Sequence, residues 1–292
     1  MSQTPAKFVR FSVLKFSRRR LLILLLCAVA YWALIHVANL LYSGSFWQQF
    51  YADPHTSVFF CEKSDLALFV RQPINTFSNI VYLIVSLIIL RRGWKDQSKR
   101  NRYNIISANP FYSITLGGIL LYIFVASTIF HSSLVEFASK LDFSAVYSLS
   151  LFPLMYFTHR VWLLSAGLPS NTKHTKSTTT VVTVFSILYL LLTFFLPEGF
   201  ENYVVLGIII FIGIFGAIVE VKAPGRTNHY YLMASMLCIL IAVMWFGFDV
   251  YKILCDPNSI IQPHSLWHLF AGISTFYFYM YIRSERNILE SN

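Results

Sequence analysis

Eight long apolar runs constrain this chain more than any other feature of its sequence. Each is about 17 to 25 residues long, the length that a helix needs to cross a bilayer. They cover residues 21–43, 74–90, 110–130, 142–161, 179–196, 203–220, 230–251 and 265–282. Only 12% of the residues are charged, about half the fraction of an average soluble domain. The sequence therefore predicts an all-α, polytopic membrane protein.

Basic residues predict how these helices are oriented. With the N-terminus placed in the cytoplasm, 19 of the 23 Lys and Arg residues fall in cytoplasmic segments and four fall outside. Membrane proteins carry such an excess of positive charge in their cytoplasmic loops. We therefore expect both termini in the cytoplasm, and we attribute the net charge of +10 to topology and anionic lipid rather than to nucleic acid. A bacterial inner membrane is not distinguished from an ER or Golgi membrane.

A pair of histidines opens the last apolar run. His264 and His268 are four residues apart, so a helix that includes both presents the two imidazoles on one face, one turn apart. That spacing suits two ligands of a single metal ion, and polar residues inside a membrane are costly and often functional. The alternative is two interfacial histidines beside Trp267, which would anchor the helix at the membrane surface.

Topology brings three further polar residues to the same membrane depth. Ser127 and His131 lie four apart at the outer end of the third run, and Asp142 opens the fourth. Three imidazoles with one open position form the ligand set of a catalytic zinc. Asp142 could then act as general acid and base, and Ser127 could donate to an oxyanion. These residues predict a hydrolase for an acyl bond of a lipid, although Asp142 could instead cap its helix.

Other polar residues could support such a site. Asp249, near the outer end of the seventh run, could be a partner of a ligand histidine. Asn75, Ser78 and Asn79 recur at helical spacing. Asn75 and Asn79 could likewise be partners of ligand histidines, or they could form hydrogen bonds between helices.

The four cysteines fall into two classes. Cys27 and Cys238 lie within apolar runs and are interpreted as small packing residues. Cys61 and Cys255 fall in the first and last outside loops, and because that side is the oxidising one they could form a disulfide.

The order of these motifs resembles the CREST superfamily of membrane hydrolases. That superfamily includes alkaline ceramidases, lipid-remodelling enzymes of GPI anchors and adiponectin-receptor-like proteins. The resemblance to alkaline ceramidases is strongest and covers residues 59–285. It rests on Ser127 and His131, Asp142 eleven residues later, Cys61-Glu62, the PINTFSN segment 73–79 and the HSLWH segment 264–268.

The resemblance implies a seven-helix zinc hydrolase that cleaves ceramide to a sphingoid base and a fatty acid. By position it assigns zinc binding to His131, His264 and His268, acid–base catalysis to Asp142 and oxyanion stabilisation to Ser127. It also implies a cysteine pair at Cys61 and Cys255.

Some positions depart from the alkaline ceramidase pattern. Animal members resemble one another in an acid-rich calcium site, of which this chain keeps Glu62 but has Phe59, Ser64 and Gln72 in place of other ligands. One carboxylate is a poor ligand set for Ca²⁺, which takes six to eight oxygens, so the sequence argues against calcium. The segment 143–145 is nearer the wider superfamily.

We therefore expect a seven-helix CREST core plus one extra N-terminal helix, acting as a zinc-dependent amidase on a membrane lipid amide. The alternatives are an acyl-ester hydrolase of the same superfamily and a receptor or transporter with structural zinc. The expected segments are a basic N-terminus (1–20), an extra helix (21–43), an outside loop (44–73), the core (74–285) and a cytoplasmic tail (286–292).

Overall fold

A computed structural model gives the fold of the chain. It describes residues 18–52, 60–98, 105–165, 200–222 and 227–285, and four isolated positions between 183 and 195. The predicted run 179–196 therefore lies almost entirely outside the described residues. The helices are α1 (Arg18–Leu41), α3 (Pro73–Ser78), α4 (Ile80–Ser98), α5 (Ile105–Ala108), α6 (Phe111–Ser133), α7 (Glu136–Ser165), α9 (Phe200–Lys222), α10 (His229–Val250), α11 (Pro263–Ser284) and the 3₁₀-helix η1 (Gly44–Gln49).

The described chain is an all-α bundle, as the apolar runs predicted. Its only β contacts are two isolated bridges in the described residues. Within the described part, three helical stretches are long and apolar enough to cross a membrane, namely Pro73–Ser98, Phe111–Ser133 and His229–Val250.

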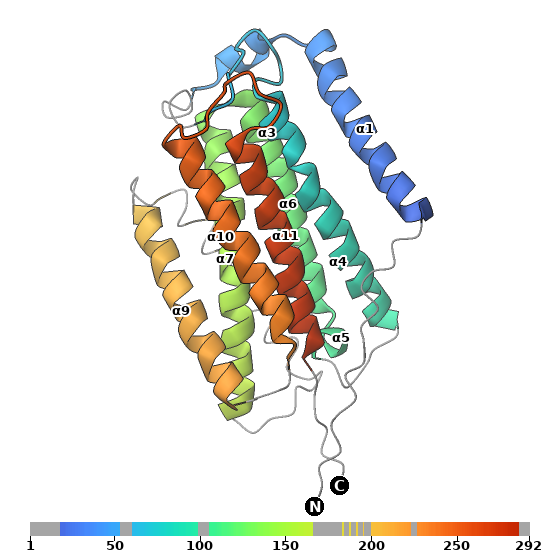
Figure 1. The fold of residues 1–292 in the computed structure, drawn as a ribbon, viewed down its shortest axis with the longest axis vertical. Helices are drawn as coiled ribbons and strands as arrows, with labels where there is room; N and C mark the ends of the chain where they lie inside the picture. The colour runs from blue at the N-terminus through green and yellow to red at the C-terminus, as the bar shows by residue number, and fades with distance from the viewer. Residues whose placement is uncertain are drawn as a thin grey trace, which may run out of the picture.

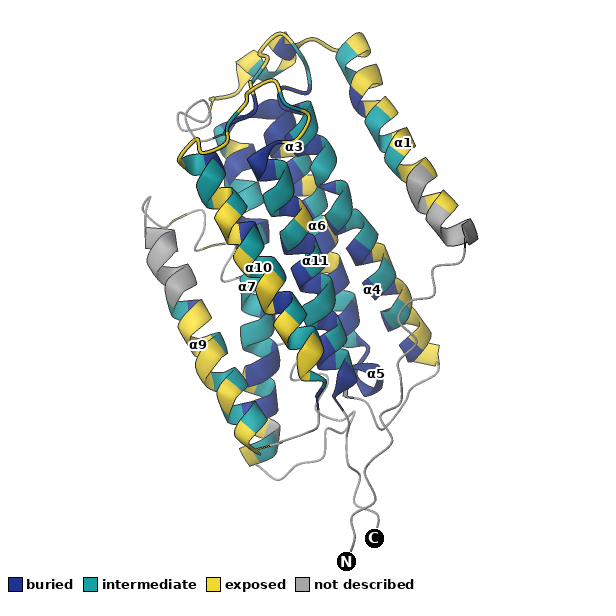
Figure 2. Ribbon diagram, in the orientation of Figure 1, coloured by how far each residue is buried: buried dark blue, intermediate teal, exposed yellow. Residues whose placement is uncertain are grey.

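Helix α6 lies in the middle of the bundle (Figure 1), packed against α4 and α7. Tyr112, Leu116 and Leu120 are fully buried, and their spacing of four places them on one face of the helix. The outer face of α10 is apolar but exposed (Figure 2), with Met233, Leu237 and Leu240 among its exposed residues. Such a surface would aggregate in water, so this face suits the hydrocarbon of a bilayer.

The turn between α6 and α7 is shorter than the gap between the predicted runs 110–130 and 142–161. Helix α6 ends at Ser133 and α7 begins at Glu136. Leu134 adopts a left-handed conformation with φ 53°, and its N–H donates to the Phe130 carbonyl. Asp142 consequently lies well inside α7, so the interpretation of Asp142 as a helix cap is wrong.

Candidate active site

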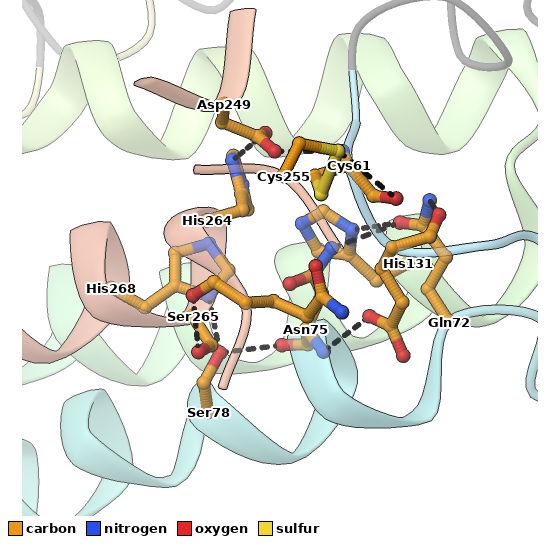
Figure 3. A network of polar contacts seen from close by, with 12 residues as sticks. Cys61, Gln72, Asn75, Ser78, His131, Asp249, Cys255, His264, Ser265 and His268 are labelled. Atoms are coloured by element: carbon orange, nitrogen blue, oxygen red, sulfur yellow. Dashed lines mark hydrogen bonds and ion pairs between the residues drawn. A yellow bond between two sulfur atoms is a disulfide. The ribbon is translucent and has the colours of Figure 1, made fainter. Parts of the chain in front are cut away.

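Three histidines meet at the end of the bundle where α6 ends and α11 begins (Figure 3). His131 comes from the last turn of α6, while His264 and His268 come from the first two turns of α11. All three are buried, and their ligand nitrogens lie within 4.8 Å of one another. The structure thus brings together the two helix ends that the sequence placed at one membrane depth.

Glycine lets α11 approach its neighbour closely below this cluster. A Cβ at Gly272, one turn after His268, would lie 2.7 Å from a methyl group of Val81 on α4. Small residues allow such close backbone approach between membrane helices. The backbone of α11 therefore lies close to α4 one turn below His268.

Each imidazole has a polar partner close to its Nδ1 atom. His131 Nδ1 lies 2.8 Å from Gln72 Oε1, and His268 Nδ1 lies 2.7 Å from Ser78 Oγ. His264 Nδ1 lies 3.1 Å from Asp249 Oδ2, an ion-pair contact without hydrogen-bond geometry. Two of the partners come from α3 and its N-cap, and the third comes from α10.

The partners determine which ring nitrogen carries the proton. The Gln72 amide nitrogen donates to Ser64 Oγ at 3.1 Å, so its oxygen accepts from His131. Ser78 donates its single proton to the Asn75 carbonyl and therefore accepts from His268. A carboxylate can only accept, so Asp249 favours a proton on Nδ1 of His264. All three Nε2 atoms are then left with a free lone pair.

This arrangement fits a metal ion held by three histidines. Ligand histidines normally donate their second ring N–H to a carboxylate or carbonyl partner, which fixes the tautomer. His131 Nε2 is buried and has no hydrogen-bond partner among the described residues. Neutral imidazole is a ligand for zinc and other transition metals, so the cluster can bind a metal.

A disulfide stabilises one side of the cluster. Cys61 and Cys255 are bonded, which confirms that prediction. The Cys61 N–H donates to Asp249 Oδ1 at 2.7 Å. The Asp249 carboxylate therefore joins the disulfide to His264, which is the position that the sequence analysis expected for it.

Ser127 and Asp142 lie together beside the histidines. Ser127 is one turn before His131 on α6 and is buried, whereas Asp142 is half-buried with its Oδ1 atom inaccessible to solvent, and the two side chains are close enough to interact. Ser127 Oγ and Asp142 Oδ1 have no hydrogen-bond partner in the described part of the chain. Tyr82 packs with its ring 5.8 Å from that of His268 and is near enough to Asp142 to interact electrostatically.

The two candidate asparagines differ in how close they come to the cluster. Asn75 Nδ2 lies 3.4 Å from Gln72 Oε1, which in turn holds His131. Asn79 Nδ2 donates to the Asn75 carbonyl on the preceding turn. Of the pair, Asn75 therefore contacts a partner of a ligand histidine, whereas Asn79 bonds to its own helix.

Glu62 has a structural role at the start of α3. Its two carboxylate oxygens accept from the N–H groups of Ile74 and Asn75, both at 2.8 Å, and so satisfy the start of α3. Burial raises the pKa of Glu62 to about 7, although those two N–H groups act in the opposite direction. Both oxygens are thus already engaged, which agrees with the argument against calcium.

Gln72 and Ser78 are the site residues that the sequence analysis missed as partners of histidines. Gln72 stands at a position where the sequence departs from a calcium site, and Ser78 recurs at helical spacing with Asn75 and Asn79. That spacing was the available signal, because it marks a polar helix face that enters the membrane. Whether this face points toward α11 depends on how the helices pack.

Comparison with known families agrees with this geometry. A family model described as Ceramidase matches residues 53–292, a range that includes the three histidines, Ser127, Asp142 and their partners. No curated protein matches the chain significantly. The chain therefore belongs to the ceramidase family and is a membrane hydrolase that acts on an amide bond.

Proposed function

We propose that the protein is a zinc-dependent amidase that hydrolyses ceramide to a sphingoid base and a fatty acid. The observation that carries the proposal is the buried set of His131, His264 and His268, each supported through Nδ1. Family membership supports ceramide as the substrate class. The chemistry of three imidazoles supports zinc.

The bond that breaks is the amide between the acyl carbon and the nitrogen of the sphingoid base. Zinc held by the three histidines would supply a Lewis acid and a bound water whose pKa is about 7. Asp142 would take the proton that the attacking water releases and return it to the departing nitrogen. Ser127 Oγ would donate to the acyl oxygen as that oxygen gains negative charge.

A lipid substrate would approach this site from within the bilayer. The exposed apolar residues on α10 indicate a surface in contact with lipid tails, and the histidines lie at one end of the same bundle. We propose that this end faces away from the cytoplasm, because the opposite end carries the basic segments counted above. The headgroup of ceramide would then lie at the site while its chains stay in the hydrocarbon.

The test is fatty-acid release by purified, metal-stripped protein after return of a single metal. Zinc should restore hydrolysis of long-chain ceramide, and calcium alone should not. The matched substrate is an ester-linked analogue with the same chains, whose faster hydrolysis would favour an acyl-ester hydrolase. Absence of hydrolysis of both substrates by zinc-loaded protein would favour a receptor.

A further inference from the structure

Helix α1 lies outside the residues that match the family, which begin at residue 53, yet it contacts the catalytic bundle. Its Tyr31 ring stacks on Phe77 of α3 at 5.9 Å and packs on Phe124 of α6 at 5.5 Å. Trp32 meets Phe77 edge to face at 5.1 Å. These contacts place α1 beside the segment that carries Gln72 and Ser78, at the edge of the bundle (Figure 1).

The helix that α1 contacts is interrupted at Asn79. Helix α3 ends at Ser78 and α4 begins at Ile80. At the break, the Asn79 N–H bonds to the Thr76 carbonyl at 3.3 Å, while the Asn75 carbonyl accepts from Ser78 Oγ. The break therefore sets the position of the Ser78 hydroxyl, which accepts from His268 Nδ1.

Tyr31 supplies a hydrogen bond to the backbone at this break. Its hydroxyl donates to the Thr76 carbonyl at 3.1 Å and lies 2.9 Å from Thr128 Oγ1. Because the Tyr31 proton goes to the carbonyl, Thr128 donates to Tyr31. Interrupted membrane helices need such partners, since no water is present to satisfy freed carbonyls.

A second polar contact from α1 reaches the segment that carries Gln72, the partner of His131. Asn39 Oδ1 accepts from the Val70 N–H at 2.6 Å, two residues before Gln72. Gln72 in turn holds His131. Helix α1 thus contacts the segments that carry the partners of two ligand histidines.

We infer that Tyr31 is a positioning residue of the metal centre and that α1 is a working part of the hydrolase. Tyr31 fixes the break at Asn79, the break fixes Ser78, and Ser78 fixes the tautomer and orientation of His268. Thr128 also ties this contact to α6, the helix of Ser127 and His131. The inference rests on the proposed function for its effect on zinc.

The test variant is Tyr31→Phe in the full-length protein, which keeps both ring contacts and removes the hydroxyl. The variant loses the bond to the Thr76 carbonyl and the bond from Thr128. Loss of the support at the helix break should weaken zinc binding and lower kcat by about 2- to 10-fold, with KM nearly unchanged. Zinc affinity is measured by chelator competition well below the unfolding temperature. The matched control is Tyr42→Phe, because the Tyr42 hydroxyl is exposed and makes no hydrogen bond with described residues; it should behave like the wild type.

A double-mutant cycle adds a sharper criterion. Thr128→Val alone should have a smaller effect than Tyr31→Phe, because the bond to the Thr76 carbonyl survives. Added to Tyr31→Phe, it should cost nothing further, since the Thr128 hydroxyl has already lost its acceptor.

Hydrogen exchange in metal-free protein tests the same contact without zinc. Tyr31→Phe should speed exchange in residues 73–82, and Tyr42→Phe should not. A Tyr31→Phe protein with a lower Tm but unchanged zinc affinity, kcat and exchange would overturn the inference and leave α1 a structural helix. If wild-type protein binds no zinc, the proposed function fails, and the exchange measurement alone decides the role of Tyr31.

Discussion

The two ends of the bundle satisfy their buried polar groups in opposite ways. At the far end, where α6 begins and α11 ends, the buried Arg160 guanidinium pairs with Glu285, which also accepts from Tyr156. Arg283 there makes two hydrogen bonds with Asp96, at 2.6 and 3.1 Å. At the site end, by contrast, lie all the buried side-chain nitrogens and oxygens without a hydrogen bond in the described residues.

The difference separates a structural region from a functional one. Opposite charges that satisfy each other need no further ligand, and removing one partner leaves a buried charge alone. Unpartnered atoms in a native structure call for an explanation such as an ion, a water or a catalytic role. The far end therefore has no need of a further ligand, whereas the site end has polar atoms free to bind one.

Removing two metal ligands should have the largest effect. In His264→Ala/His268→Ala we expect zinc binding and ceramide hydrolysis to fall by more than about 100-fold, beyond the range for outer partners. Metal content per chain and fatty-acid release are the measurements. If the double variant still bound one zinc ion per chain, the histidines at the site end would not hold the metal.

Asp142→Asn tests catalysis without removing a proposed ligand. The amide matches the carboxyl in size but cannot exchange protons near neutral pH, so fatty-acid release should fall about 10²- to 10⁴-fold. Zinc content should stay near that of the wild type. Wild-type turnover would exclude the proton role, whereas loss of zinc would make Asp142 a ligand.

Glu285→Gln tests the far end. It leaves the Arg160 charge buried without its partner, so the free energy of unfolding should fall by about 3–5 kcal/mol, measured by denaturation in detergent. Zinc affinity of the folded protein should not change. The control is Glu136→Gln, which breaks the exposed ion pair with Lys140 and should cost at most about 1 kcal/mol. Equal losses in the two variants would contradict the structural role.

Gln72→Leu and Ser78→Ala remove the acceptors for His131 and His268. Each should weaken zinc binding by about 10- to 100-fold and affect stability less than Glu285→Gln does. Gln49→Leu is the control, because Gln49 is exposed and bonds only locally, to the Phe46 carbonyl. Unchanged zinc affinity in both site variants would mean that the imidazoles need no outer partners.

A pH-dependent effect is expected at Glu62, a buried acid held by N–H groups rather than by a cation. Burial raises its pKa from 4.5 to about 7, so as pH rises through this window the unfolded chain releases the proton first. The free energy of unfolding should therefore fall, by at most about 1.4 kcal/mol per pH unit. Glu62→Gln should remove that contribution in a stability-versus-pH series. Identical slopes in both proteins would count against it.

Sequence alone was enough to predict the cluster of three histidines that the structure shows. His264 and His268 are local in sequence, and alternating helix direction brings His131 to the same end. The fold class followed from the apolar runs because a bilayer leaves helices few alternatives. The disulfide followed from two outside loops.

The contacts that support the histidines were harder to predict, because they depend on irregular backbone positions. Leucine is an unusual residue at a left-handed position, so the tight turn at Leu134 and the early start of α7 gave no signal. The break at Asn79 falls inside an apolar run that reads as one helix. Gln72 and Ser78 act across elements distant in sequence, which requires the packing of α11 on α4.

The bond between Cys61 and Cys255 can form only late in the synthesis of the chain. The two cysteines are 194 residues apart, and a ribosome adds about 5–20 residues per second. Roughly 10 to 40 seconds of synthesis thus separate the first cysteine from its partner, and His264 and His268 are made later still. A nascent chain thus contains His131 well before the other two histidines of the cluster, so the proposed centre can be completed only after the last helix has been made.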